Sequence, residues 1–296
     1  MFRLEVVCLE WSAVGIKWKK DMRDWHTHIL PEMDDGSGSV EESIEMLAAE
    51  TAQGVDEIVL TPHFYAHRED AAEFLRRREA SFQKLLAGLD GQCLGSARGI
   101  ELGADGQRSE VRDQCSVSSG QEAVVSGQKS VVSGQGAVVG GQGSVASEQS
   151  VELRLPDGAI CPRLLLGAEV YYFDGLYKMK DEYMDALCFG RRRYLLIEMP
   201  FASWTKQELD VVRMTALRQQ VTPMLAHVDR YLGYKGNIKL LPELADMGAV
   251  FQINVESIVK GFAGRHVRRV IDEYGAVFGT DCHNMTSRRP EGMISG

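Results

Sequence analysis

Short apolar runs alternate with helix-like segments along most of the chain, and this alternation constrains the fold more than any other feature. Each run is short enough to be a strand buried on both faces. The runs lie at residues 57–60, 164–169, 194–198, 221–227, 249–254 and 276–283. Strands that alternate with helices indicate parallel βα units, so the sequence predicts an α/β fold.

Capping signals and apolar spacing predict where the intervening helices lie. Ser39 is followed three residues later by Glu42, and Thr205 by Glu208, which is the pattern of a capping box at a helix start. Gly54 is a predicted stop for the first of these helices. Apolar residues at helical spacing predict further helices over about 69–89, 242–247 and 265–274.

Side chains that can bind a metal ion follow one after another at the ends of the predicted strands. They are His26, His28, His63, Glu169, Glu198, His227, Asp281 and His283. In a βα barrel the carboxyl ends of the strands meet at one mouth, where active sites lie. Five of the seven histidines fall at these ends, whereas chance would scatter them through helices and loops. The pattern therefore predicts a metal centre, while His67 and His266 are expected to be solvated.

The first of these strand ends lies in the stretch from Asp24 to Gly36. Strand side chains alternate between faces, so His26 and His28 are expected on one face. Two carboxylates, Asp34 and Asp35, follow just downstream. Alone, the stretch is equally compatible with surface histidines beside an acidic turn, and the other strand ends favour the metal interpretation.

The kind of ligand limits the kind of metal. Imidazole and carboxylate groups suit manganese, iron or zinc in an open site rather than a closed structural zinc site. Cys282 is expected to point into the core instead. Eight or nine ligands exceed the needs of one ion, so two or three ions are expected. Arg230 and Arg288 follow two of the ligands and could bind phosphate, although each could also be a solvated arginine.

Composition excludes several classes of partner. The formal net charge of -9 argues against a general binder of nucleic acid or of anionic membranes. The six cysteines show neither a CxxC pair nor disulfide-like spacing, which favours a reducing compartment. No run approaches the roughly 18 apolar residues that span a membrane. We therefore expect a cytoplasmic protein without a membrane span.

One long segment differs in character from the rest of the chain. A seven-residue repeat over 116–150, rich in Ser, Gly and Gln, predicts a flexible or loosely extended insertion, with a chance of local β structure at its Val-Val pairs. The predicted organisation is an N-terminal extension foreign to the natural protein (1–21), the first part of the fold (22–102), the low-complexity insertion (103–157) and a second part that is short at its C-terminus (158–296).

Six motifs together resemble one known superfamily. They are WHTHILPEMDDG, LTPHF, GAEVYY, LLIEMP, TPMLAHVDRY and GTDCHN. In this order they resemble the PHP (polymerase and histidinol phosphatase) superfamily, and within it the bacterial capsule-type tyrosine-protein phosphatases. The resemblance covers about 22–102 and 160–290. It departs from the family at Val228 and Asp229, where relatives usually have Pro-Glu.

The resemblance implies a distorted, TIM-like βα barrel with a trinuclear site, commonly loaded with manganese. Two arginines, Arg230 and Arg288, would bind the substrate phosphate. The implied ligand sets are His26, His28, Glu169 and Asp281 for one ion, Glu169, Glu198 and His227 for a second, and Asp35, His63 and His283 for a third, with Asp35 preferred over Asp34.

The resemblance also implies an activity. A metal-activated hydroxide would hydrolyse phosphotyrosine, notably on a bacterial tyrosine autokinase that controls capsule or exopolysaccharide synthesis. Two alternatives stay open from the sequence: a phosphatase for a small molecule such as histidinol phosphate, and an inactive remnant that binds only metal or a partner. Assembly of several chains into an oligomer is compatible with each interpretation.

Overall fold

The structure is a computed structural model that describes residues 22–96, 117–119, 122–123, 153–259 and 264–293. The strands are β1 (Met22–Thr27), β2 (Val55–Leu60), β3 (His63–Phe64), β4 (Val117–Ser119), β5 (Glu122–Ala123), β6 (Arg163–Leu166), β7 (Glu169–Tyr171), β8 (Tyr194–Glu198), β9 (Thr222–Leu225), β10 (Val250–Asn254) and β11 (Val277–Gly279). The helices are α1 (Val40–Ala52), α2 (Ala71–Ser96), the 3-10 helix η1 (Leu176–Lys178), α3 (Asp181–Leu187), α4 (Lys206–Gln219), α5 (Val228–Tyr231), α6 (Lys235–Ile238), α7 (Leu241–Asp246), α8 (Val255–Val259) and α9 (Arg265–Tyr274).

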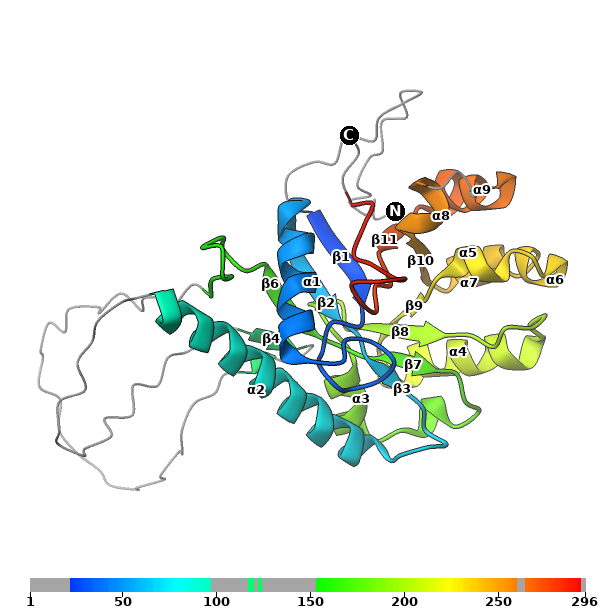
Figure 1. Ribbon diagram of the computed structural model, residues 1–296. Coiled ribbons are helices and arrows are strands. Elements are labelled where there is room, and N and C mark those ends of the chain that lie inside the picture. The colour runs from blue at the N-terminus through cyan, green and yellow to red at the C-terminus, as the bar shows by residue number, and fades with distance from the viewer. Residues whose placement is uncertain (1–21, 97–116, 120–121, 124–152, 260–263, 294–296) are drawn as a thin grey trace, which may run out of the picture.

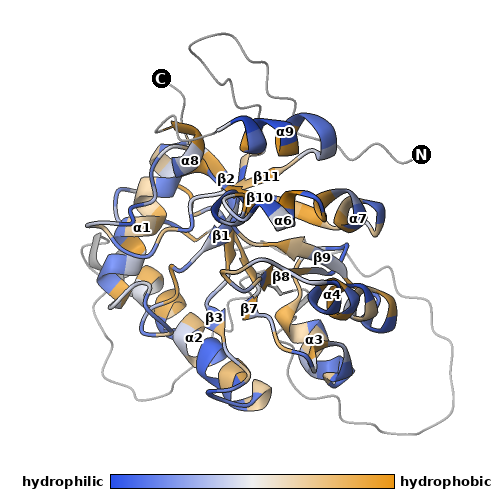
Figure 2. Ribbon diagram, turned by 90° about the vertical axis from the view of Figure 1, so that its right-hand side faces the viewer, coloured by the Kyte–Doolittle hydropathy of each residue, from blue (hydrophilic) through white to orange (hydrophobic). Residues whose placement is uncertain are grey.

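The strands form a curled, almost entirely parallel arrangement. One sheet has the order β1-β2-β6-β4-β5 and the other β11-β10-β9-β8-β7-β3, and among the described pairs only β4–β5 is antiparallel. Backbone hydrogen bonds from Gly167 N to Leu60 O at 2.9 Å and from Glu169 N to Pro62 O at 3.0 Å continue the β2–β6 pairing of the first sheet towards the β3–β7 pairing of the second. The α/β fold predicted from the alternation is therefore confirmed, and helices surround the strands (Figures 1 and 2).

The curl brings the first strand beside the last. Asp281 N donates to His26 O at 2.8 Å, and His28 N donates to Cys282 O at 2.9 Å. Thr27 and Cys282 form a parallel bridge. Segments near the two ends of the described chain are thus paired side by side, at the level of the predicted ligands.

Apolar side chains pack on both faces of the curled sheet. The inner cluster takes side chains from β1, β2, β6, β8, β9, β10 and β11, with Phe189 and Ala226 from adjoining loops: Trp25, Val59, Leu165, Phe189, Tyr194, Leu196, Met224, Ala226, Val250 and Val277. Leu195 and Ile197 alternate with Leu196 and belong to the larger outer cluster, which packs against the helices. A cluster that receives side chains from so many strands shows that the sheet wraps around it.

The capping signals are confirmed in part. Thr205 and Glu208 form the complete capping box of α4. At α1, Ser39 Oγ accepts from Glu42 N at 3.2 Å, but the Glu42 carboxylate accepts from Gly38 N instead of closing the box. The helices predicted over 242–247 and 265–274 correspond to α7 and α9, and the helix predicted over about 69–89 extends to Ser96.

One strand prediction is wrong in a way that matters for the site. The run 164–169 was expected to be one strand ending at Glu169, but it breaks into β6 and β7, and Glu169 begins β7. Gly167 lies at the break, where an added Cβ would be 2.7 Å from the Phe189 ring. The buried Arg78 of α2 donates to Gly167 O at 2.7 Å, so a helix far away in sequence holds the bend.

Two other expectations fall mainly outside the described residues. The sequence also predicts a strand that begins within 96–101, and residues 97–101 lie outside the described part of the chain, as does most of the repeat over 116–150. The described part of the repeat includes β4, which pairs in parallel with β6, and β5, which pairs with β4. Among the described helices, none is long and apolar enough to cross a membrane.

Candidate metal centre

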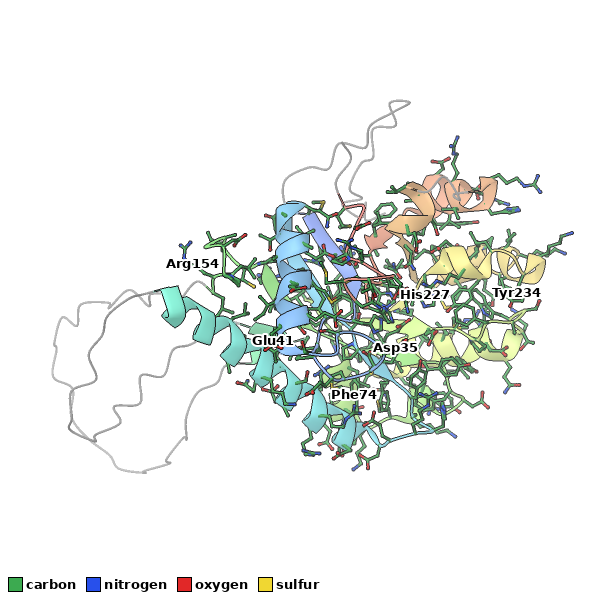
Figure 3. All side chains as sticks on the ribbon, in the orientation of Figure 1. Asp35, Glu41, Phe74, Arg154, His227 and Tyr234 are labelled. Atoms are coloured by element: carbon green, nitrogen blue, oxygen red, sulfur yellow. The ribbon has the colours of Figure 1, made fainter. Side chains whose placement is uncertain are left out.

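The curled sheet gathers the nine predicted ligands from elements that span the described chain. Three sets of ligand atoms each lie within 4.8 Å of one another. Figure 3 labels Asp35 and His227, which lie over the central strands. The three sets are His26, His28, Glu169 and Asp281; His28, Asp35, His63 and His283; and His63, Glu169 and Glu198.

The first set is fully enclosed by protein. His26 Nε2 lies 3.1 Å from His28 Nε2. Glu169 Oε2 lies 3.1 Å from the first of these nitrogens and 3.2 Å from the second. Asp281 Oδ1 lies 3.5 Å from both. All four side chains are buried, so water does not solvate these polar atoms freely.

Neighbouring side chains fix which nitrogen of each imidazole carries hydrogen. Gln252 Oε1 accepts from the backbone N of His227 at 2.6 Å and lies 3.0 Å from His26 Nδ1, so Nδ1 is the donor. His28 Nδ1 lies 2.7 Å from Asp34 Oδ2, which accepts. In the neutral imidazoles both Nε2 lone pairs then face each other and the Glu169 carboxylate. Such a group of converging lone pairs needs a cation between them.

The other two sets adjoin the first through shared ligands. Asp35 Oδ1 lies 3.5 Å from His63 Nε2 and 3.4 Å from His283 Nε2. His63 Nδ1 lies 3.1 Å from Glu169 Oε2. The Asp35 side chain is 65% exposed, so this end of the centre opens to solvent. Asp34, in contrast, binds His28 and the backbone N of His63 at 2.7 Å and orients ligands rather than completing a set.

His227 reaches the same carboxylates from the opposite side. Its Nε2 lies 2.9 Å from Glu169 Oε1 and 3.8 Å from Glu198 Oε1. The third set consists of His63, Glu169 and Glu198. The family resemblance implies the same two carboxylates together with His227. Glu169 is therefore the residue that connects all parts of the centre.

Several buried polar atoms of the centre have no hydrogen-bond partner among the described residues. Four of them belong to residues of the three sets, namely His63 Nδ1, Glu169 Oε2, Glu198 Oε2 and His283 Nε2, and a fifth is His227 Nδ1. Buried polar groups in proteins are nearly always satisfied, so a cluster of exceptions requires an explanation. Divalent cations would satisfy all four atoms, and imidazole and carboxylate donors fit such ions.

The charge balance also favours cations. Burial, and then the neighbouring Glu169, raise the pKa of Glu198 to about 8. Burial alone would also raise the pKa of Glu169, but His26 and His63 outweigh it and hold that pKa well below its ordinary value. The centre therefore does not keep both carboxylates ionised at neutral pH without added positive charge.

Both predicted phosphate-binding arginines lie beside the centre and meet at one atom. Arg230 Nη2 donates to Asp281 Oδ2 at 2.7 Å, and Arg288 Nη2 lies 2.8 Å from the same oxygen. Their side chains are 36% and 34% exposed, so each retains contact with solvent. Asn254 Nδ2 also donates to this oxygen at 2.9 Å, which leaves Asp281 Oδ1 to face the imidazoles.

Close backbone approach makes glycine necessary at two positions. A Cβ at Gly279 would lie 2.7 Å from His26 Cβ, and one at Gly36 would lie 2.2 Å from His28 O. His227 and Asp281 have φ values of 31° and 52°, in the left-handed region that His and Asp adopt more readily than most residues. Strained backbone of this kind gathers at functional sites.

Sequence reasoning missed the residues that orient the ligands. Gln252 contacts two candidate ligands, and its Nε2 donates to Asn254 Oδ1 at 3.0 Å. Asp229, one of the departures from the family pattern, accepts from Asn254 N at 3.0 Å and thereby supports the same network. The only available signal was that Gln252 and Asn254 alternate along a buried strand. Cys282 is buried in the outer cluster, as expected.

The fold and the site together define an α/β protein with a candidate polynuclear metal centre. Residues 22–92 and 144–294 match the family described as capsular polysaccharide synthesis, CpsB/CapC. The chain belongs to this family, which confirms the capsule-type resemblance of the motifs. The match leaves out residues 93–143, which include most of the repeat.

Individual relatives agree with the family. The chain is 26% identical to the tyrosine-protein phosphatase CpsB of Streptococcus pneumoniae over 285 residues, covering 91% of this chain and 86% of the relative. It is 25% identical to the putative tyrosine-protein phosphatase CapC of Staphylococcus aureus over 276 residues, covering 90% and 79%. The chain also shares the fold of a solved structure from a study of YwqE from Bacillus subtilis and CpsB from Streptococcus pneumoniae, which describes them as unique metal-dependent tyrosine phosphatases. The two chains are 22% identical, and their match has a TM-score of 0.57 and covers 90% of this chain and 82% of the other.

Proposed function

We propose that this protein is a metal-dependent protein-tyrosine phosphatase. The observation that carries the proposal is the group of unsatisfied, converging ligand atoms around Glu169 with two arginines at its edge. Relatives that span most of the chain are named tyrosine-protein phosphatases, which supports phosphotyrosine as the substrate.

The nine ligands are proposed to hold two or three divalent ions, with manganese expected and iron or zinc as alternatives. Ions bound there would activate a water molecule and neutralise charge on a phosphoryl group. The oxygen and nitrogen donors, and the position of Cys282 in the core, are in keeping with this choice.

The chain's own residues then have distinct tasks. Glu169 lies where the ligand sets meet and holds them in register. Gln252 and Asp34 bind the Nδ1 atoms of His26 and His28, which directs the Nε2 atoms inward and leaves the lone pairs there when the imidazoles are neutral. Arg230 and Arg288 present guanidinium groups at the solvent-facing edge, where a phosphate oxygen can take the place of Asp281 Oδ2 as their acceptor.

The curled sheet is proposed to be the distorted βα barrel of the PHP type. The pairing of β1 with residues 281–283 and the inner cluster support a closed ring of strands. Active sites of such barrels lie where the strands end, as the candidate ligands do here. We also propose that the low-complexity segment, expected over 103–157, is an insertion between the two parts of this barrel. The gap in the family match over 93–143 supports an insertion in this region.

The family assignment suggests where the protein acts. We propose a phosphotyrosine protein as the substrate, in particular a bacterial tyrosine autokinase of capsule or exopolysaccharide synthesis, met in the cytoplasm. The proposal follows from the description of the family as one of capsular polysaccharide synthesis.

The test combines metal content with turnover. Manganese-loaded protein is expected to bind more than one ion by elemental analysis, to unfold cooperatively and to cleave a phosphotyrosine peptide faster than histidinol phosphate. His227→Ala is expected to lose both metal and turnover, because it removes a contact to Glu169 and Glu198. His67→Ala is the matched control, since His67 is exposed. Faster cleavage of histidinol phosphate would favour the small-molecule alternative, and a metal-free, non-cooperative chain would favour the inactive remnant.

A further inference from the structure

An exposed aromatic ring lies against one of the candidate metal ligands. Phe201 is 48% exposed, although it lies only three residues after Glu198, the buried end of β8. Its ring stacks on His227 with ring centroids 5.7 Å apart and an interplanar angle of 19°. Single exposed apolar residues are common on protein surfaces, but this one adjoins the centre at which the substrate is proposed to bind.

The segment that carries Phe201 is held rigidly by its neighbours. Tyr234, which Figure 3 shows farther out than His227, donates its hydroxyl to Phe201 O at 2.8 Å. The buried Asn237 donates to Ala202 O at 3.0 Å and accepts from Trp204 N at 2.8 Å. The exposed ring is thus fixed before any ligand arrives, and a fixed ring loses little entropy when a ligand binds.

The same short helix links this ring to the phosphate-binding edge. Arg230 and Tyr231 are adjacent residues of α5. Arg230 pairs with Asp281 at the centre, while the Tyr231 ring packs against Phe201 with centroids 5.1 Å apart. A phosphate held by Arg230 therefore has an aromatic surface within the same local unit.

A second aromatic residue adjoins the centre, but it is already covered. Tyr65 lies beside His63, with ring centroids 5.1 Å apart. The Arg68 guanidinium lies 4.3 Å from the centroid of the Tyr65 ring, and Tyr171 packs 5.6 Å away. Tyr65 thus has neighbours that would have to move, whereas nearly half of the Phe201 side chain is open to solvent.

We propose that Phe201 binds the aromatic ring of the phosphate ester and makes the centre select aryl over alkyl phosphates. The proposal rests on the proposed function, because it assigns the ring of phosphotyrosine to Phe201 and its phosphate to the metal centre and arginines. Aromatic pairs prefer offset or edge-to-face contacts, and one such contact together with its buried area corresponds to about a tenfold gain in affinity.

Two phosphonates provide the test, because one carries a phenyl group on phosphorus and the other a methyl group. Calorimetry on manganese-loaded full-length protein would compare phenylphosphonate with methylphosphonate. Phe201→Ala and Phe201→Leu are expected to weaken phenylphosphonate binding about tenfold and to leave methylphosphonate binding unchanged. Phe201→Tyr is expected to bind phenylphosphonate more tightly than methylphosphonate, as expected of the wild-type protein. Leu217→Ala is the matched control, because Leu217 is a 69% exposed apolar residue on α4.

The outcomes separate this inference from the proposed function. Equal weakening of both phosphonates in the Phe201 variants, with or without loss of manganese, would mean that Phe201 only supports His227, and would overturn the inference. Unchanged binding of both, or a wild-type protein without preference, would overturn it as well. If wild-type protein neither binds a phosphonate nor cleaves a phosphotyrosine peptide, the proposed function fails and the inference fails with it.

Discussion

At the scale of single residues, the position of the hydrogen on the His26 imidazole is decided by a neighbour far away in sequence. Gln252 is 226 residues from His26, yet it sets the tautomer of that histidine and also binds the backbone of His227. Outer partners of this kind orient metal ligands and tune their basicity. The metal affinity of the proposed centre is therefore expected to depend on residues that are not candidate ligands themselves.

Replacing Gln252 tests this dependence. Gln252→Leu is expected to lower manganese affinity by roughly 10- to 100-fold, because His26 loses the acceptor that fixes its ring. Calorimetric titration of the metal-depleted protein would measure the change. Gln219→Leu is the matched control, since Gln219 is also buried but donates to Tyr177 O and Met179 O. Wild-type affinity in Gln252→Leu would show that the tautomer is fixed in another way.

The arginines are expected to act on substrate and not on metal. Arg230→Ala and Arg288→Ala should each lower kcat/KM for a phosphotyrosine peptide by about 100-fold, since a preorganised charge at a phosphoryl group contributes on that order. Metal content should stay unchanged, because both guanidinium groups contact Asp281 Oδ2, whereas Oδ1 faces the imidazoles. Arg213→Ala, which breaks pairs with Asp210 and Glu243, serves as the control. Loss of metal in either variant would contradict the role as a phosphate clamp.

The sequence could place the ligands, but not their partners. His26, Glu198 and Asp281 were found because ligand-type residues recur at the ends of apolar runs, and this pattern survives without coordinates. Gln252 and Asn254 carried no comparable signal, because amides are common and their role exists only once β10 lies beside β1 and β11. Asp35, and not Asp34, is a member of the candidate sets of ligand atoms, and its role as a ligand stays a prediction.

At the scale of elements, the approach of β11 to β1 determines whether the ligands meet. Gly279 of β11 lies against His26, where a Cβ would be 2.7 Å from His26 Cβ and 2.9 Å from its backbone N. Neither atom is the end of a flexible side chain, so the strands themselves would have to separate.

Gly279→Ala is expected to disrupt the centre through the backbone. The variant should lose most bound manganese and unfold at a lower temperature, with a destabilisation of about 1–3 kcal/mol, as overpacking typically costs. Elemental analysis and thermal melting would measure both. Gly233→Ala provides the control, because a Cβ there meets nothing within 4 Å. Normal metal content in Gly279→Ala would show that β1 and β11 can separate without harm to the ligands.

Helix boundaries and strand breaks differed in how well the sequence predicted them. The α4 capping box was predictable because Thr205 and Glu208 act within one turn. The break between β6 and β7 was not, because it depends on Arg78 of α2 and on Phe189, neither of which is near Gly167 in sequence. Local chemistry is visible in a sequence, whereas a bend held by tertiary contacts is not.

At the scale of the whole molecule, the curled sheet brings several ionisable side chains together. The protein alone does not keep both Glu169 and Glu198 ionised at neutral pH. Imidazoles and carboxylates from both ends of the described chain share a buried space around Glu169. The alternation of strands and helices predicted an α/β fold, but the pairing of residues 26–28 with 281–283 could be seen only in the structure. If ions bind at the centre as proposed, this pairing is expected to couple the stability of the whole fold to them.

That coupling should depend on pH in a defined direction. Burial, and then Glu169, raise the pKa of Glu198 to about 8 from its ordinary 4.5. Between these values the folded, metal-free protein holds a proton that the unfolded chain releases, so the unfolding free energy falls as pH rises. Burial alone would lower the pKa of His28, but Asp34 and other carboxylates raise it well above 6.5, and the stability it contributes is also lost as pH rises.

Metal binding should follow the opposite trend, because the ions require an ionised Glu198 and neutral imidazoles. The rise in melting temperature caused by manganese, relative to protein with a chelator, is therefore expected to grow between pH 7 and pH 8.5. His63, whose pKa burial lowers to about 4, is already neutral in this range. Glu198→Gln should make the trend shallower, since its amide does not titrate, while His28 still contributes to it. If the rise in melting temperature caused by manganese stays constant or shrinks as pH rises in the wild-type protein, the centre does not release protons when it binds metal.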